Sequence, residues 1–424
     1  MKKISILFFS LLIVLASKAQ QPQWIVYDTS NSSLPGNEVM DIAITEGNKW
    51  IGTLKKGITK FDGIDWDLYN KDNSNLPGNE IGSIDIDETG NPWITVAQVY
   101  DFNLLLGIAE FDGSNWTLYN TSTSGIPHNR INKILIDNQG NKWMSTAYLG
   151  IVKFDGTNWT VYDTSNSGLP HNDICLMAID NQGNKWMGPG QTGLGISQIQ
   201  TGLVKFDDTS WTVYNTSNSG LPENYISAVA IDQMGNKWIG TWGGGVAKFD
   251  GTNWTVYNKS NSGLPDNKVA EIAIDGEGNK WLGTRDQGLV KFDGTNWTIY
   301  NESNSGLPKN YISSIAIDQE GNKWIGTGGG VAVFNETGVS VEEKEQSRND
   351  LKIYPNPASD NVRLSMNPAI ENIRVYDLTG KQIKHIDRIQ AKKTSVNLSD
   401  IEPGIYLFRI RAGDQIFSRK IVKY

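Results

Sequence analysis

The chain has 424 residues, enough for two or three domains, and it is rich in tryptophan (15) and glycine (44). Its formal net charge of −8 divides into −17 over residues 20–350 and +6 over residues 351–424, with the remainder at the N-terminus. The acidic balance of the longer part argues against nucleic acid or an anionic membrane surface as a partner. The single cysteine, Cys175, excludes an internal disulfide, and we expect it to be a buried structural thiol.

The first 19 residues have the pattern of a secretory signal peptide. Two lysines precede an apolar run over residues 4–16, and Ser17 and Ala19 suit cleavage before Gln20. The run is too short to span a bilayer, no cysteine stands directly after the cleavage point to carry a lipid anchor, and no later stretch is apolar enough to cross a membrane. We therefore predict that the chain is secreted and has no transmembrane segment.

From residue 23 to residue 335 a unit of about 43 residues recurs seven times. Each copy carries a tryptophan shortly after a Gly-Asn pair and a second tryptophan that opens a short run ending in tyrosine. The first series comprises Trp50, Trp93, Trp143, Trp186, Trp238, Trp281 and Trp324. The second series comprises Trp24, Trp66, Trp116, Trp159, Trp211, Trp254 and Trp297. The fifteenth tryptophan, Trp242, lies outside both series.

Each copy divides into four short strands, as its fifth occurrence illustrates. Residues 225–232 are apolar on both faces, and residues 236–241 follow a turn that contains Gly-Asn. Residues 245–250 follow a glycine turn, and residues 253–258 follow Asp-Gly-Thr. Long amphipathic helical patterns are missing. Four antiparallel strands repeated seven times predict an all-β fold, a seven-bladed β-propeller over residues 20–335.

The two ends of the repeat region are complementary. Residues 23–28 correspond to a fourth strand without its first three, and residues 330–335 correspond to a third strand without its fourth. We predict that residues 23–28 complete the last blade, which closes the ring and hides its edges.

The repeated run "LPxN", followed by an apolar strand and then "IDxxGNKWIGT", resembles the two-component regulator propeller repeat across residues 23–335. That family includes periplasmic sensor regions of hybrid histidine kinases, which form propellers and respond to carbohydrates. The resemblance implies a propeller. It does not carry a signalling role to this chain, because neither a kinase nor a transmembrane segment is expected after the repeats.

Residues 336–350 are polar and charged like a linker, and the alternating pattern of residues 351–424 predicts a small Ig-like β-sandwich. The runs "YPNPASD" (354–360), "VYDLTGK" (375–381), "PGIYLFRI" (403–410) and the terminal "KIVKY" resemble the type A C-terminal sorting domain of the type IX secretion system. The resemblance implies contact with that secretion machinery, export across the outer membrane, and a product that is released or held at the cell surface.

Length variation among the copies falls on one predicted face of the propeller. The turns between second and third strands share this face with the inter-blade loops, and residues 95–107 and 188–202 are insertions in two such turns. Aromatic side chains there can stack on sugar rings or hold a peptide. The candidate ligand-binding residues are Tyr100, Phe102, Tyr148, Trp242 and Arg285. The alternative is that Tyr148 and Trp242 only cover the ends of their blades.

A second candidate set occupies the x position of "LPxN" in four consecutive copies, at His128, His171, Glu223 and Asp266. These residue types can hold a metal ion or act as acid and base, although such variation also fits an unconstrained exposed position. The asparagine that follows in every copy favours a turn hydrogen bond. The repeated aspartate of "IDxxGN" likewise indicates turn chemistry, since no copy has the spacing of a calcium loop.

The sequence favours a non-enzymatic propeller at the cell surface or in the medium that binds a glycan or a peptide and requires no cofactor. One alternative is a secreted polysaccharide lyase or hydrolase with its site at the channel mouth, and another is a purely structural surface protein. No residue is assigned as catalytic, because the chain lacks a nucleophile elbow, a P-loop, a His-Glu-x-x-His motif and a Cys-x-x-Cys motif.

Overall fold

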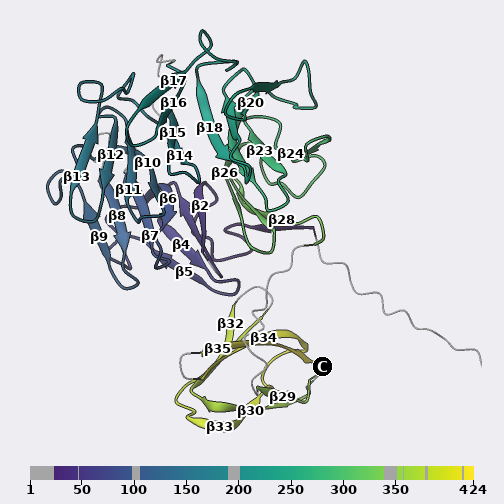
Figure 1. The fold of residues 1–424 in the computed structure, drawn as a ribbon. Coiled ribbons are helices and arrows are strands. Elements are labelled where there is room, and N and C mark those ends of the chain that lie inside the picture. Colours follow the sequence, from purple (N-terminus) through teal and green to yellow (C-terminus); the bar gives the residue numbers. More distant parts are fainter. Residues whose placement is uncertain are drawn as a thin grey trace, which may run out of the picture.

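The structure is a computed structural model, and the residues that it describes are 23–45, 47–97, 106–189, 201–338, 351–356, 358–377, 381–412 and 415–424. Within these ranges every regular secondary-structure element is a β-strand (Figure 1). Seven four-stranded antiparallel sheets form a ring, and two further sheets form a separate C-terminal domain. None of the described segments forms a helix of the length and hydropathy that a membrane crossing requires.

Each blade runs outward from the central channel, and its first strand is innermost. The innermost strands are β2 (Val39–Thr45), β6 (Glu80–Ile86), β10 (Ile131–Ile136), β14 (Leu176–Ile179), β18 (Ile226–Ile231), β22 (Val269–Ile274) and β26 (Ile312–Ile317). The second strands are β3 (Asn48–Thr53), β7 (Pro92–Ala97), β11 (Lys142–Thr146), β15 (Lys185–Gly188), β19 (Lys237–Thr241), β23 (Lys280–Thr284) and β27 (Lys323–Thr327). Strand β2 contacts both β6 and β26, so the inner strands form a continuous ring.

The outer half of each blade consists of two four- or five-residue strands. The third strands are β4 (Ile58–Phe61), β8 (Gly107–Phe111), β12 (Ile151–Phe154), β16 (Leu203–Phe206), β20 (Val246–Phe249), β24 (Leu289–Phe292) and β28 (Gly330–Phe334). The outermost strands are β5 (Trp66–Tyr69), β9 (Trp116–Tyr119), β13 (Trp159–Tyr162), β17 (Trp211–Tyr214), β21 (Trp254–Tyr257), β25 (Trp297–Tyr300) and β1 (Trp24–Tyr27).

The N-terminal strand closes the ring, as predicted from the sequence. Strand β1 pairs antiparallel with β28, so that Trp24 lies opposite Phe334 and Tyr27 lies opposite Val331. The Trp24 ring stacks on Phe334 with 4.3 Å between ring centroids. The last blade therefore combines the first strand of the repeat region with its last three.

The two repeated tryptophans fill the space between neighbouring blades. Trp238 stacks on Tyr257 of its own blade at 5.9 Å and meets the edge of Phe292 in the next blade at 6.0 Å. In that next blade Trp297 stacks on Phe292 at 4.2 Å. Among the described residues seven buried clusters of this kind surround the ring. Both tryptophan series recur because each junction between blades needs both rings.

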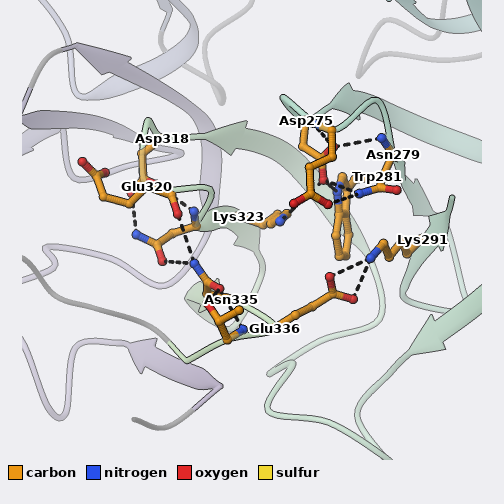
Figure 2. A network of polar contacts seen from close by, with 12 residues as sticks. Asp275, Asn279, Trp281, Lys291, Asp318, Glu320, Lys323, Asn335 and Glu336 are labelled. Atoms are coloured by element: carbon orange, nitrogen blue, oxygen red, sulfur yellow. Dashed lines mark hydrogen bonds and ion pairs between the residues drawn. The ribbon is translucent and has the colours of Figure 1, made fainter.

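The repeated aspartate is a buried hydrogen-bond acceptor (Figure 2). Asp275 accepts a hydrogen bond from the Trp281 indole at 2.8 Å, and its carboxylate also binds the backbone and side-chain amides of Asn279. Lys323 of the next blade places its Nζ 3.6 Å from the Asp275 carboxylate and 4.6 Å from the centre of the Trp281 ring. The first copy has no aspartate here, and the buried Trp50 indole has no partner within the described part of the chain.

The C-terminal domain is a two-sheet β-sandwich with its own core (Figure 1). One sheet contains β29 (Lys352–Tyr354), β30 (Asn361–Ile370) and β33 (Ala391–Asn397), and the other contains β31 (Asn372–Tyr376), β32 (Gln382–Ile386), β34 (Gly404–Ala412) and β35 (Gln415–Lys423).

Arg409 of β34 forms an ion pair with Asp65, in the turn between β4 and β5. This turn reads Ile-Asp where the comparable turns of other copies read Thr-Asn, Ser-Asn or Thr-Ser.

Candidate ligand-binding face

Hydrogen bonds place the turns between second and third strands on the same face as the inter-blade loops. The backbone amide of Gly245, in the turn before β20, donates to the carbonyl of Asn267, in the loop before β22, at 3.0 Å. Gly57 and Gly150 make the same bond to Asn79 and Asn172. The sequence predicts that these turns and loops share one face. We call the surface that they form the variable face.

The asparagine of "LPxN" holds its own loop together. In the fifth copy the Asn224 side-chain oxygen accepts a hydrogen bond from the Thr216 backbone amide at 2.8 Å. The same bond, to an amide eight residues earlier, is made by Asn37, Asn79, Asn129, Asn172, Asn267 and Asn310. The turn interpretation of this residue therefore agrees with the structure.

The four x-position residues also form hydrogen bonds within their own blades, three of them to their own loop. His128 accepts a hydrogen bond through Nδ1 from the backbone amide two residues ahead at 2.9 Å, and His171 does the same at 2.8 Å. Asp266 accepts one in the same way at 3.0 Å, while the Glu223 carboxylate accepts from the Gly244 amide at 3.0 Å. Across the described ranges no group of three or more His, Cys, Asp or Glu side chains is placed to hold a metal ion.

The predicted ligand-binding residues fall into separate places. Tyr100 and Phe102 lie outside the described residues. Tyr148, in the turn between β11 and β12, is 58% exposed, and its hydroxyl accepts a hydrogen bond from Arg130 at 2.9 Å. Its ring also meets the edge of His128 at 5.7 Å. The third blade thus presents an exposed aromatic ring beside a guanidinium group.

Trp242 and Arg285 come together on the fifth and sixth blades. The Arg285 guanidinium lies 5.0 Å from the centre of the Trp242 ring, and the centre of the Tyr225 ring lies 6.1 Å from it. The Trp242 backbone amide donates to the Tyr225 carbonyl, and Glu223 holds the Gly244 amide of the same turn. The extra tryptophan therefore stands half-buried on a turn that is fixed at two points.

Tyr225 and Tyr311 belong to this face, although sequence reasoning did not single them out. Tyr225 is only 3% exposed, and its hydroxyl has no hydrogen-bond partner among the described residues. Burial, with a smaller effect of Cys175 and nearby carboxylates, raises the pKa of Tyr225 to about 12. Tyr311 is 50% exposed. Both follow the asparagine of "LPxN" directly, where the other five copies carry a charged residue.

Below the variable face, charged side chains from distant blades face the central channel. Lys133 places its Nζ 3.5 Å from the Asp41 carboxylate, and Glu271 lies within electrostatic reach of both. Burial raises the pKa of Glu271 to about 7 and that of Asp85 to about 6. A bulge in the inner strand comes just before Lys133, Asp41 and Glu271, and such bulges redirect side chains.

Cys175 differs from the sequence expectation. It is half-buried and lines a cavity of about 480 Å³ in the channel, together with Lys133, Ser227 and Glu271. Its thiol donates to the Asp173 carboxylate at 3.7 Å. The expectation of a buried thiol was wrong because Cys175 lies just before β14, on the channel side, and not between the blades where Ile174 is buried.

Comparison with known proteins agrees with this architecture. Residues 352–424 match the secretion system C-terminal sorting domain, and residues 306–329 match the two component regulator propeller. The chain ends in a secretion sorting domain. This sorting domain implies export to the cell surface or the medium and contact with the secretion machinery. A sequence search of curated proteins found no match.

Solved structures share the fold at low sequence identity. The extracellular domain of BT3049 from B. thetaiotaomicron is 20% identical, with a TM-score of 0.61 over 95% of this chain and 57% of that one. PorZ, a surface component of the type-IX secretion system of Porphyromonas gingivalis, is 18% identical, with a TM-score of 0.58 over 92% of this chain and 59% of that one. A streptogramin B lyase is 13% identical, with a TM-score of 0.57 over 74% of this chain and 97% of that one. The chain thus spans less than two thirds of the length of the first two, and the likeness shows the fold alone.

Proposed function

We propose that this secreted propeller is a non-enzymatic ligand-binding module that holds a glycan or a peptide on its variable face. The observation that carries the proposal is the pairing of two side chains. Trp242 lies on a turn that Glu223 holds in place, and the Arg285 guanidinium lies 5.0 Å from the centre of its ring. A rigid aromatic side chain loses little entropy on binding, so a preorganised ring of this kind is a suitable anchor for a ligand. Tyr148 supplies a second exposed ring two blades away.

The hydrogen bonds of the "LPxN" loops support a binding role over a lyase or hydrolase. His128, His171 and Asp266 each use a side-chain atom to accept an amide of their own loop, and Glu223 supports the Trp242 turn. A general base must reach the proton that it removes, and these side chains are occupied in shaping the face. The export route belongs to the same proposal: a signal peptide over residues 1–19, which lies outside the described residues, followed by passage guided by the sorting domain.

Binding to a glycan array and a peptide array tests the proposal. For a ligand that either array identifies, Trp242→Ala and Tyr148→Ala should each weaken affinity about tenfold or more. Truncating an aromatic anchor typically costs over 1 kcal/mol of binding free energy. Met234→Ala is the matched control, because Met234 is 81% exposed in the turn between β18 and β19, on the opposite face. The proposal is wrong if neither array shows binding, or if both aromatic variants bind as the unaltered chain does.

A further inference from the structure

The cavity in the central channel is lined by none of the aromatic side chains of the variable face. It measures about 480 Å³, within the range of small-molecule sites, and apolar residues such as the half-buried Leu176 form part of its wall. Its polar lining comes from Lys133, Ser227 and Glu271, on the inner strands β10, β18 and β22, and from Cys175, just before β14. Because these residues are far apart in the sequence, no sequence motif predicts the cavity.

Hydrogen bonding within the protein leaves this cavity rich in acceptors. The Lys133 ammonium is already engaged by the Asp41 carboxylate at 3.5 Å. The Ser227 hydroxyl donates to the Val269 carbonyl, which leaves its oxygen lone pairs free to accept. The Cys175 thiol donates to Asp173. The protein thus engages the Ser227 and Cys175 donors internally, and the Ser227 hydroxyl and the Glu271 carboxylate present oxygen acceptors to the cavity.

Glu271 is the group in this lining with the least compensation. The Lys133 charge and a hydrogen bond from the Ile272 backbone favour its ionised form, but Asp41 repels it, and Glu271 forms no ion pair within 4.0 Å among the described residues. A buried carboxylate without a paired cation is costly, and a bound cation would remove that cost. An ammonium group also donates three hydrogen bonds, which matches a lining of acceptors.

We propose that the channel cavity is a binding site for a small organic ammonium ion, no larger than an amino sugar, whose nitrogen pairs with Glu271. Hydroxyl groups of the same ligand would donate to Ser227, and its carbon skeleton would lie against Leu176. This site goes beyond the proposed function, because it lies in the channel and involves neither Trp242 nor Tyr148.

The single cysteine allows a direct test. Because Cys175 lines the cavity and the chain has no other cysteine, alkylation by iodoacetamide reports on the cavity alone. The labelling rate of the full chain would be measured by mass spectrometry, alone and with glucosamine, glucose or glucuronate at equal ionic strength. Labelling of glutathione under the same conditions controls for direct effects on the reagent.

Glucosamine should slow the labelling of Cys175 about fivefold or more, whereas glucose and glucuronate should have little effect. Glu271→Gln should abolish the protection by glucosamine. Equal labelling rates with all three sugars, equal protection by glucose, or protection that persists in Glu271→Gln would each overturn the channel site. If the arrays identify a ligand while Cys175 labelling stays unchanged with glucosamine, the proposed function stands and this inference fails.

Discussion

At the scale of single residues, the aspartate of each first hairpin shows how one carboxylate can organise a whole repeat. Asp275 receives hydrogen bonds from an indole and from three amide groups, and a lysine of the next blade lies 3.6 Å away (Figure 2). Burial opposes the charge on Asp275, but the bonds from Trp281 and Asn279 outweigh it and lower its pKa. The aspartate is therefore retained for hydrogen bonding within the repeat, and a bound metal ion is not needed to explain it.

Replacing Asp275 should be costly. We expect Asp275→Ala to lower the free energy of unfolding by about 2–4 kcal/mol, because the buried Trp281 indole would lose its acceptor and the buried Lys323 ammonium would lose its paired carboxylate. Urea unfolding followed by tryptophan fluorescence measures this change. Asp286→Ala, in an exposed turn of the same blade, should change stability by about 0.5 kcal/mol or less. Equal effects of the two substitutions would contradict the assigned role.

At the scale of elements, strand β1 holds the two ends of the repeat region together. Its register with β28 covers an edge that would otherwise expose unpaired backbone groups. Close packing reinforces the closure, since a Cβ atom on Gly306 would lie 2.6 Å from the Cβ atom of Trp24. The same contact occurs between Gly220 and Trp254, in the middle of the repeat region and away from the closing strand. The closing strand is therefore packed as tightly as an ordinary fourth strand.

Weakening this strand should have consequences that an internal blade does not show. Trp24→Ala and Trp254→Ala each remove a ring that stacks on a phenylalanine, so both should lower stability by about 3–5 kcal/mol. Trp24→Ala should in addition free the edge of β28 and produce oligomers. Size-exclusion chromatography at several protein concentrations tests this difference. Identical elution of the two variants would refute a special role of β1.

At the scale of the whole molecule, two sets of carboxylates give stability a defined pH dependence. The hairpin aspartates, such as Asp232, have lowered pKa values because hydrogen bonds from their own hairpin outweigh burial. Their contribution is complete above the unfolded value near 4 and is lost as the pH falls through the lower folded value. Glu271 behaves in the opposite sense, because burial raises its pKa from 4.5 to about 7. Its ionisation costs stability as the pH rises from about 5 to 7.

We therefore expect the free energy of unfolding to be greatest near pH 5, to fall by on the order of 1–3 kcal/mol toward pH 7, and to fall again below pH 4. Glu271→Gln should reduce the slope between pH 5 and pH 7, since it removes one of the buried carboxylates that titrate there, while Asp85, with a pKa of about 6, remains. Glu88→Gln, in an exposed turn, should leave the profile unchanged. Thermal or urea unfolding across this pH range provides the measurement, and an unaltered slope in Glu271→Gln would contradict the expectation.

The number of blades, the closing strand and the sorting domain were predictable from the sequence by itself, because they depend on repetition, alternation and turn residues along the chain. The position of Trp242 on the variable face followed from the same periodicity. Only the tertiary structure showed that Arg285 packs on Trp242 and that Cys175, Lys133 and Glu271 line one cavity. Simple alternation places Lys133 away from the channel, and a bulge reverses its direction. Contacts across a closed ring depend on its curvature and on such bulges, which spacing along the chain does not encode.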